Sequence, residues 1–595
     1  MVPPNRVMRT IVPVAVTEPK PGVFVFDMGQ DFAGWTQLRV SGPAGATVRL
    51  RYAERIHPDG NLAQEISSPY VFEGPFQTNS YTLKGNRPPG RKGTGTSFAP
   101  GTMRSTVGRK MSQSPAGEEV WEPRFAYHGY RWVEVTGFPG KPTLDSLRGR
   151  VVHTAFTPAG SFECSNALLN KIQQMTLWSY RSNFVGYPTD CPHREKNGWT
   201  GDAHLAAEQA MYNFYNLAAY ENWINSLKDE QRPSGELPGI VPTSGWGYAW
   251  GNGPAWDSAY ALIPWYAYQY YGDTGMLAEQ YDRLKRYVDY LTRRARGHMV
   301  DIGLGDWVPA KTETPVAVTS TGYYYVDARI VSKIAKLLGK TADAQKYAEL
   351  AAEIRRAFHE KFCQGDGRVA NNSQTALSCA IYQGLATPRE RPAILAQLVA
   401  NVEQHQNHLD TGILGAKYLL HTLTDLGRTD VAYRIATQTT PPSYGAWIPR
   451  GATTLWEDWQ EGYSRNHVMF GDISAWFYQA LAGLNVDPDR PGFKHFFVRP
   501  RPVGDLTWVR ATHQSPYGPI AVSWQKKDNT FSLNLTVPVD TTATVYVPAQ
   551  RVARVREGGQ AADQSPGVKF LRMEAGAAVF EVGAGRYAFL VKNTG

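Results

Sequence analysis

The sequence predicts a multidomain α and β protein in which an (α/α)6 toroid is flanked by an N-terminal and a C-terminal β-sandwich. Three observations predict this fold. Strand-like patterns fill the chain to about residue 154, helical periodicity runs from about 165 to 484, and strand-like patterns then return. A chain of 595 residues is also too long for one hydrophobic core. We therefore expect a β-sandwich over 1–160, a helical barrel over 161–485 and a second β-sandwich over 486–595.

The N-terminal region carries short segments rich in β-branched and aromatic residues. V-F-V-F-D, Q-L-R-V, T-V-R-L-R-Y, R-W-V-E-V and L-R-G-R-V-V-H are separated by turn sequences such as G-P-A-G and H-P-D-G. Such segments, bounded by turns, are typical of a β-sandwich. A basic stretch rich in Gly, Pro, Ser and Thr interrupts them at about 86–118, and it has too few apolar side chains to order itself. We expect a flexible basic insert there.

Twelve segments with helical periodicity follow. In one of them Leu277, Tyr281, Leu284, Val288 and Leu291 recur at intervals of three and four and so line one helix face. Twelve helices joined alternately by short and long connections suggest six hairpins in a toroid whose mouth is built by the long loops. The predicted segments are 166–183, 203–214, 216–231, 255–271, 274–294, 323–338, 341–361, 373–384, 388–403, 412–425, 428–438 and 470–483.

Strand patterns return in the last part of the chain. T-W-V-R-A-T, I-A-V-S-W, F-S-L-N-L-T-V, A-T-V-Y-V and Y-A-F-L-V alternate or are rich in β-branched residues. These segments predict that a second β-sandwich closes the chain.

Composition argues against several classes of protein. There is no apolar run of about 18 residues and no signal-peptide pattern, so we expect no membrane association and, provisionally, a cytoplasmic location. The four cysteines lack C-x-x-C spacing, which disfavours a zinc finger or a disulfide-stapled scaffold. Six of the nine excess positive charges fall within the insert, so we expect no nucleic-acid partner. The oligomeric state stays open.

The densest group of chemically useful residues is D-C-P-H-R-E-K-N-G-W-T-G-D, which runs from Asp190 to Asp202 in a loop that opens a helix. Asp202 is placed to cap this helix, and capping and sugar binding explain it equally well. Glu195 lies between Arg194 and Lys196 with no helical register to satisfy, so it is either a proton donor or part of a solvated surface pair. A proton donor must keep its proton at the working pH, which burial and neighbouring acids favour and Arg194 would oppose.

A second acidic and aromatic stretch, G-A-T-T-L-W-E-D-W, runs from Gly451 to Trp459. Cleavage of a glycosidic bond needs two carboxylates on opposite sides of a sugar ring, and these two stretches could supply them. Successive side chains diverge in any regular geometry, so Glu457 and Asp458 should not share a task. The residues alone leave open which of the two faces the cleft. His467 could bind a hydroxyl or be an ordinary satisfied polar residue.

Two glycine-flanked loops are rich in aromatic residues. G-W-G-Y-A-W-G-N-G-P-A-W-D holds Trp246, Trp250 and Trp256, and G-L-G-D-W-V-P holds Trp307. Core packing explains many tryptophans, but loops of this kind are poor core material. Because the C–H faces of a pyranose pack on flat rings, we expect these loops to provide sugar platforms.

The two acidic stretches and S-R-N-H-V-M-F-G, in this order, resemble the bacterial α-L-rhamnosidases of glycoside hydrolase family seventy-eight. The similarity extends to D-M-G-Q-D-F-A-G-W near the N-terminus and to the C-terminal sandwich. The resemblance implies hydrolysis of small-molecule or oligosaccharide rhamnosides with inversion, with Glu195 as general acid and Glu457 as general base. We expect no metal and no cofactor. The resemblance also implies rhamnose contacts from Asp190, Arg194, Trp199, Asp202, Trp256, Trp307 and His467.

Other functions stay open. A metal-dependent hydrolase could use Asp190, His193, Asp202 and His204, whose ligand types suit several divalent ions but whose spacing matches no zinc pattern. A polysaccharide lyase or a different glycosidase could use the same toroid. A non-catalytic sugar-binding protein would need only the aromatic residues. The aglycone and the presence of a structural calcium ion stay undecided.

Overall fold

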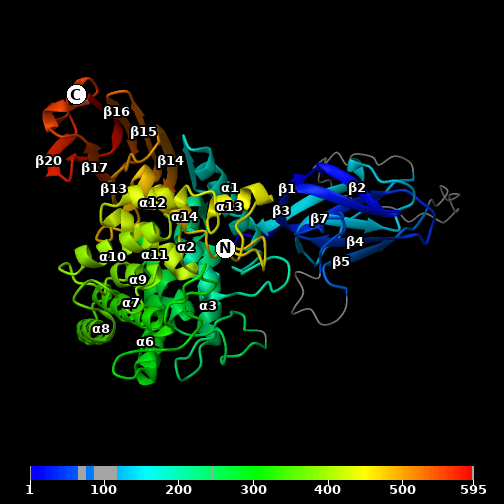
Figure 1. Cartoon of the computed structure of the whole chain (residues 1–595), viewed down its shortest axis with the longest axis horizontal. Helices are drawn as coiled ribbons and strands as arrows, with labels where there is room; N and C mark the ends of the chain where they lie inside the picture. Colours follow the sequence, from blue (N-terminus) through cyan, green and yellow to red (C-terminus); the bar gives the residue numbers. More distant parts are fainter. Residues whose placement is uncertain (1, 65–74, 86–116, 244, 593–595) are drawn as a thin grey trace, which may run out of the picture. The chain divides into compact units, whose positions relative to one another are not determined.

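The structure is a computed structural model that describes residues 2–64, 75–85, 117–243 and 245–592. The chain forms two compact units (Figure 1). One unit contains the helices and the C-terminal strands, and the other contains 6–153 together with 192–194. The predicted class, a helical toroid preceded and followed by β-sheet regions, is confirmed. The predicted basic insert lies outside the described residues as far as residue 116.

The N-terminal unit is one curled eight-stranded sheet. Its central strand, β3 (Val23–Val40), pairs with β2 and β7 along its first part and with β6 and β8 along its last part. The register with β7 shifts between Asp27 and Phe32, and such an irregularity bends a strand so that it serves both halves of a sheet. The other strands are β1 (Asn5–Ile11), β2 (Ala15–Lys20), β4 (Thr47–Ala53), β5 (Thr78–Thr82), β6 (Glu119–Trp121), β7 (His128–Thr136) and β8 (Leu147–Thr154).

Each of the twelve predicted helical segments contains a helix. The segment predicted at 255–271 is divided into two helices, and the one predicted at 470–483 ends in a π-helical turn, Phe477–Ala482. The helices are α1 (Ala167–Ser182), α2 (Thr200–Asn213), α3 (Leu217–Glu230), α4 (Pro254–Asp257), α5 (Ala259–Tyr271), α6 (Gly275–Arg294), α7 (Val316–Leu337), α8 (Thr341–Phe362), α9 (Gln374–Tyr382), α10 (Arg391–Gln404), α11 (Ile413–Asp425), α12 (Thr429–Ala436), α13 (Tyr444–Trp447) and α14 (Ile473–Trp476).

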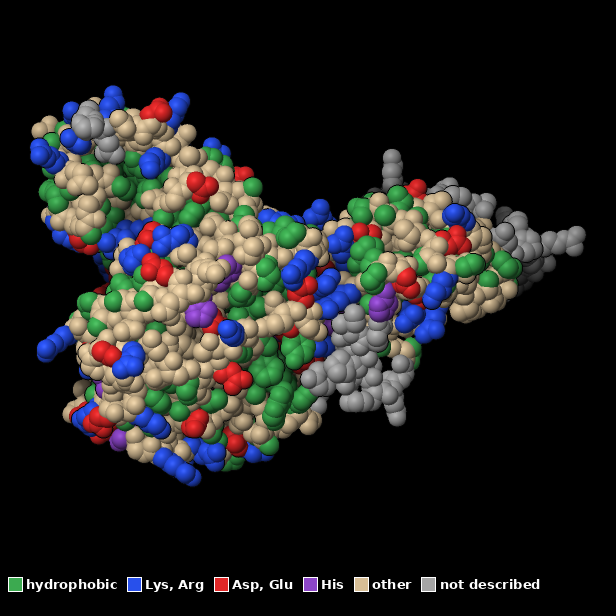
Figure 2. Space-filling view, viewed as in Figure 1, with side chains coloured by type: hydrophobic (Ala, Val, Ile, Leu, Met, Phe, Trp, Pro, Cys, Tyr) green, Lys and Arg blue, Asp and Glu red, His purple; other side chains and the backbone are tan. Residues whose placement is uncertain are grey.

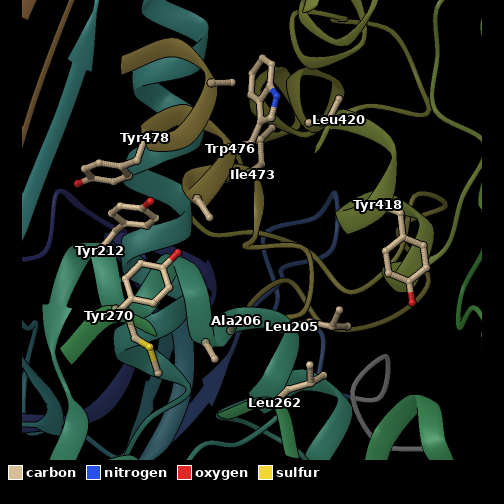
Figure 3. Packing of buried hydrophobic residues seen from close by; sticks show 14 of the residues in the cluster. Leu205, Ala206, Tyr212, Leu262, Tyr270, Tyr418, Leu420, Ile473, Trp476 and Tyr478 are labelled. Atoms are coloured by element: carbon tan, nitrogen blue, oxygen red, sulfur yellow. The ribbon is translucent and has the colours of Figure 1, made fainter. Parts of the chain in front are cut away.

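Helix α2 lies in the interior of the helical unit. All of its residues except Glu208 are buried, which is the pattern of a helix surrounded by other helices. In the core drawn in Figure 3, Tyr212 of α2 stacks on Tyr478 with ring centroids 4.7 Å apart, and it meets Tyr270 of α5 edge-on at 5.1 Å. This packing fixes α2, and therefore the loop that leads into its first turn.

A buried group of charges also joins the inner helices. Lys417 Nζ of α11 lies 2.6 Å from Asp472 Oδ1 and 2.7 Å from Glu208 Oε2. His421 Nε2 lies 2.8 Å from the other oxygen of Asp472. A lysine and a histidine thus face two carboxylates, and such pairing offsets the cost of removing charges from water.

The C-terminal strands form two sheets, of seven and five strands. Phe580 stacks on Phe589 with centroids 5.5 Å apart, so the two sheets pack face to face as a sandwich. One strand of the larger sheet, β10 (Gly160–Cys164), precedes α1 and pairs with β14. The remaining strands are β12 (Leu484–Val486), β13 (His495–Val498), β14 (Trp508–Ser515), β15 (Gly518–Lys527), β16 (Thr530–Val537), β17 (Thr542–Pro548), β18 (Val555–Glu557), β19 (Gln560–Ala561), β20 (Val568–Glu574), β21 (Ala577–Val582) and β22 (Gly585–Lys592). A further two-stranded pair joins β9 (Thr157–Pro158) to β11 (Phe214–Tyr215).

Basic and acidic side chains are interspersed on the visible face of the helical unit (Figure 2). Among the described residues, no helix combines the length and the apolar character needed to cross a bilayer.

Candidate active site

The loop before α2 is folded back on itself and held against a neighbouring segment. Asp190 and Asn197 bond reciprocally, the amide of Asp190 to the carbonyl of Asn197 (3.1 Å) and the amide of Asn197 to Asp190 Oδ1 (2.8 Å). The amide of Val241 donates to the carbonyl of Gly198 at 2.8 Å. A Cβ atom at Gly198 would lie 1.8 Å from the carbonyl oxygen of Val241, so this close approach requires glycine.

Within this loop, Glu195 is oriented by a tryptophan. Trp199 is buried, and its Nε1 donates a hydrogen bond of 2.8 Å to Glu195 Oε2. Burial, and then the charge of Glu195, raise the pKa of Asp190 well above its usual range. Asp190 therefore retains its proton at a pH where an isolated carboxyl group would lose it.

His467 connects the two acidic stretches. Its Nε2 lies 3.1 Å from Asp202 Oδ1, and its Nδ1 lies 3.6 Å from Glu457 Oε2. Burial lowers the pKa of His467, but Glu457 and Asp202 more than offset this and raise it to about 9. At neutral pH the side chain is therefore an imidazolium ion between two buried carboxylates.

The two adjacent acids, Glu457 and Asp458, have different partners. Glu457 Oε2 faces His467 and accepts the amide of Ser464 at 3.0 Å. Both oxygens of Asp458 accept the amide of Gly462, at 3.1 and 3.0 Å, and so close a tight turn. Glu457 is the acid that joins the charge cluster.

Asp202 does not cap α2. The residue at the cap position is Trp199, no side chain bonds the first amides there, and Asp202 lies in the first turn. The capping interpretation is wrong, because His467 offers Asp202 an opposite charge at 3.1 Å.

Asp190 brings the two halves of the cluster together. Ligand-type atoms of Asp190, Cys191 and His467 lie within 4.8 Å of one another, and Asp190 also interacts with Glu195. Glu195, which is half-buried, and Glu457, which is buried, thus belong to one group of charged residues.

Two candidate ligands of the metal-dependent alternative have other partners. His204 Nε2 bonds the carbonyl of Ala255 at 2.8 Å, and burial lowers the pKa of His204 to about 3. His193 Nδ1 lies 3.4 Å from Glu54 Oε1 within the N-terminal unit. Arg194 belongs to the same unit, so its predicted sugar contact stays a prediction.

Two of the predicted aromatic contacts, Trp256 and Trp307, lie against the first turns of helices. Trp256 in α4 is buried against the first turn of α2, where a Cβ at Gly201 would lie 2.6 Å from the indole nitrogen. Trp307 is 36% exposed, and its carbonyl accepts the first amide of α11, that of Ile413, at 3.0 Å. Their contacts to a sugar stay predictions.

Two residues that sequence reasoning did not single out also contact the charged cluster. The Cys191 side chain hydrogen-bonds Asp190, and the Ser464 backbone pairs with Glu457 in both directions. The position of Cys191 directly beside Asp190 was a signal that could have found it. Ser464 contacts Glu457 through its backbone amide and carbonyl. Backbone contacts of this kind cannot be recognised from the type of side chain in the sequence.

Three family models match the chain. The one described as the bacterial α-L-rhamnosidase 6 hairpin glycosidase domain matches residues 157–481. The C-terminal domain of these enzymes matches 483–562, and their concanavalin-like domain matches 17–153.

Individual proteins match over nearly the whole chain. An α-L-rhamnosidase of Streptomyces avermitilis is 38% identical over 99% of this chain and 54% of its own length, so the chain spans about half of that relative. A crystal structure of a Streptomyces avermitilis α-L-rhamnosidase complexed with L-rhamnose superposes with a TM-score of 0.89 and shares the same 38% identity, over 99% of this chain and 54% of that one. An α-L-rhamnosidase structure from Dictyoglumus thermophilum gives a TM-score of 0.89 at 37% identity, covering 100% of this chain and 64% of that one.

Proposed function

The chain belongs to the bacterial α-L-rhamnosidase family, and on this basis we propose that it releases terminal α-L-rhamnose from rhamnosides by single displacement with inversion. The observation that carries the proposal is the charge cluster, in which the buried Asp190 connects the half-buried Glu195 on one side with the buried His467 and Glu457 on the other. An inverting hydrolase needs two carboxyl groups acting on one sugar. This cluster supplies two glutamates with distinct surroundings.

Glu195 acts as general acid. The Trp199 indole holds one of its oxygens, and Glu195 delivers a proton to the glycosidic oxygen. As this proton is transferred, the bond between the anomeric carbon and that oxygen breaks, and the bonding electrons leave with the aglycone.

Glu457 acts as general base. It removes a proton from a water molecule, which attacks the anomeric carbon from the opposite face and yields β-L-rhamnose. Carboxyl groups that share such a task stand about 6.5 to 9.5 Å apart, which leaves room for the water. The imidazolium of His467 holds the Glu457 and Asp202 carboxylates and offsets their charge.

The substrate is a small-molecule or oligosaccharide rhamnoside. Buried charged groups suit the sugar hydroxyls, and indole faces suit its C–H surfaces. We assign these contacts to Asp190, Arg194, Trp199, Asp202, Trp256, Trp307 and His467. The mechanism derived from these residues uses no metal or cofactor.

The test compares Glu195→Gln and Glu457→Gln on two substrates, methyl and nitrophenyl α-L-rhamnoside. Each variant should lose about 10²- to 10⁴-fold in kcat on the methyl substrate. Because nitrophenolate leaves without protonation, Glu195→Gln should lose much less on the nitrophenyl substrate, whereas Glu457→Gln should lose equally on both.

Asp458→Asn is the matched control, since Asp458 closes a turn beside the proposed base. Circular dichroism checks that each variant is folded, and NMR of the first product should detect the β-anomer. Release of the α-anomer first, or near-normal turnover by Glu457→Gln, would refute the assigned roles.

A further inference from the structure

The loop between α3 and α4 carries two exposed tryptophans that the proposed mechanism does not use. Trp246 is 41% exposed and Trp250 is 47% exposed. Their rings stack with centroids 5.6 Å apart and an interplanar angle of 25°. Trp250 also meets Trp199 edge-on at 5.2 Å, and Trp246 lies 6.3 Å from Trp199. Trp199, Trp246 and Trp250 thus form one continuous aromatic surface, referred to below as the tryptophan wall.

The tryptophan wall begins at the proposed proton donor. The indole nitrogen of Trp199 donates to Glu195 Oε2 at 2.8 Å, and the other two rings extend from Trp199 toward solvent. In glycoside hydrolysis the general acid stands beside the glycosidic oxygen and therefore beside the departing group. The wall consequently lies on the aglycone side of the bond to be cleaved.

The aromatic residue between these two tryptophans has a different role. The hydroxyl of Tyr248 donates to the carbonyl of Glu230, and the guanidinium carbon of Arg232 lies 3.7 Å from the centre of its ring. The loop is closed by Thr243, whose hydroxyl donates to the carbonyl of Gly247 at 3.1 Å. Tyr248 fastens the loop, so anchoring does not require Trp246 or Trp250 to be aromatic.

The backbone at Gly251 lies directly against Trp199, the buried member of the tryptophan wall. Gly251 has a φ of +76°, and a Cβ atom there would lie 2.5 Å from Trp199 Cζ3. The edge of Trp199 therefore rests directly on the chain that carries Trp250. Two large apolar rings held outward on such a loop gain little for folding, and contiguous exposed apolar surface is typical of a binding site.

Resting on the function proposed above, we propose that Trp246 and Trp250, the exposed part of the tryptophan wall, form the aglycone subsite and select rhamnosides whose departing group is a flat aromatic ring. Aromatic groups stack on indole faces in offset or edge-on arrangements, which an exposed stacked pair permits. A methyl group or a puckered ring offers less flat surface for this contact.

The test measures kcat/KM for the wild type, Trp246→Ala, Trp250→Ala and the double variant on three substrates: benzyl, cyclohexylmethyl and methyl α-L-rhamnoside. All three release alkoxides, so the need for proton donation is similar. We expect each replacement to lower the benzyl-to-methyl ratio by about 2- to 12-fold, as stacking energies of this kind imply. The cyclohexylmethyl-to-methyl ratio should fall less.

The ratios of kcat/KM distinguish a loss of aglycone recognition from a loss of folded enzyme. Less folded enzyme lowers the apparent kcat/KM for all three substrates by the same factor. Trp250→Phe, which keeps a flat ring, should restore part of the benzyl preference. Tyr517→Ala, which removes an aromatic ring that is 40% exposed in the turn between β14 and β15, should leave every ratio unchanged.

The possible outcomes distinguish the two proposals. If the wild type hydrolyses rhamnosides but the ratios do not change in the variants, the aglycone subsite is refuted while the hydrolase function stands. An equal fall for benzyl and cyclohexylmethyl refutes selection of flat rings. A wild type that hydrolyses no rhamnoside refutes both proposals.

Discussion

At the scale of single residues, His467 decides the charge balance of the site. It is buried, lies between Asp202 and Glu457, and has a pKa raised to about 9. The proton on His467 lets two carboxylates remain buried close to each other. A neutral side chain at this position would leave them without an opposite charge between them.

The His467→Asn substitution should therefore have a pH-dependent effect on stability. The folded pKa of about 9 exceeds the unfolded value of about 6.5, so stabilisation by the proton is complete below about pH 6.5 and is lost as the pH rises through about 9. The difference in the free energy of unfolding between wild type and variant should shrink across this interval, by about 1.4 kcal/mol per unit of pKa shift. Denaturant unfolding at several pH values measures it.

His298→Asn, at an exposed histidine in the loop after α6, controls for the substitution itself. A difference for His467→Asn that stays constant from pH 6 to pH 10 would contradict the argument.

Prediction of the site from the sequence reached its limit at the roles of single residues. The sequence identified both acidic stretches and His467, because charged residues concentrated in loops are conspicuous. Apart from the family resemblance, which implies Glu457, the residues could not choose between Glu457 and Asp458. The choice depends on the amide of Gly462, which lies beside Asp458, and on His467, which lies beside Glu457. These are tertiary distances, which no local pattern contains.

At the scale of elements, the first turn of α11 is capped by the carboxylate of Asp306, which lies in the loop between α6 and α7. Asp306 Oδ2 accepts the amide of Gly412 at 2.8 Å, and Oδ1 accepts those of Leu414 at 2.8 Å and Gly415 at 3.1 Å. Amides in the first turn of a helix have no partner within the helix, so this carboxylate satisfies three of them at once.

Asp306→Ala should leave these buried donors without an acceptor and lower the free energy of unfolding by about 3 kcal/mol. Chemical denaturation followed by circular dichroism measures the loss. Asp301→Ala, at an exposed acid of the same loop, should cost less than about 0.5 kcal/mol. Equal effects of the two substitutions would mean that Asp306 does not stabilise α11 through these bonds.

Helices with strong hydrophobic periodicity were predicted from the sequence, but the ends of helices with low helix propensity were not. Helix α7 starts at Val316 rather than at 323, because its first turns read V-A-V-T-S-T-G, a poor helix former. Contacts from outside the helix stabilise this part. Ser320 Oγ donates to the carbonyl of Ile302 at 2.7 Å, and Thr321 Oγ1 donates to that of Val300 at 3.1 Å.

At the scale of the molecule, the helices and the C-terminal strands belong to one compact unit. The indole of Trp524 in β15 donates to the carbonyl of Leu481 at the end of the last helix, at 2.7 Å. The hydroxyl of Tyr212 in α2 donates to the carbonyl of Leu484 in β12 at 2.8 Å. Buried bonds of this kind should make the two parts unfold together.

Trp524→Ala tests this cooperativity. Removing the buried ring should lower the free energy of unfolding by about 3 to 5 kcal/mol, and the transition of the helical circular dichroism signal should shift with it. Trp508→Ala, at a half-buried tryptophan of the same sheet, should shift it less. A helical transition that does not move in Trp524→Ala would mean that the sandwich unfolds on its own.

The succession of strand, helix and strand regions was predicted, but the closure of the larger C-terminal sheet was not. The short segment G-S-F-E-C of β10 pairs with β14 in the register Gly160 to His513. Local alternation can predict that a strand exists, but it contains no information about a partner so far along the chain.

This pairing constrains how the nascent chain matures. The ribosome delivers Gly160 about 350 residues before His513. At usual elongation rates, on the order of 5–20 residues per second, β10 waits roughly 20 to 70 seconds for its neighbour. Until then its edge is open to other chains, and the newly made helices lack the sheet that later covers their ends. The larger C-terminal sheet can therefore form only after β14 has been synthesised, and shielding ribosome-bound intermediates from one another should favour correct folding.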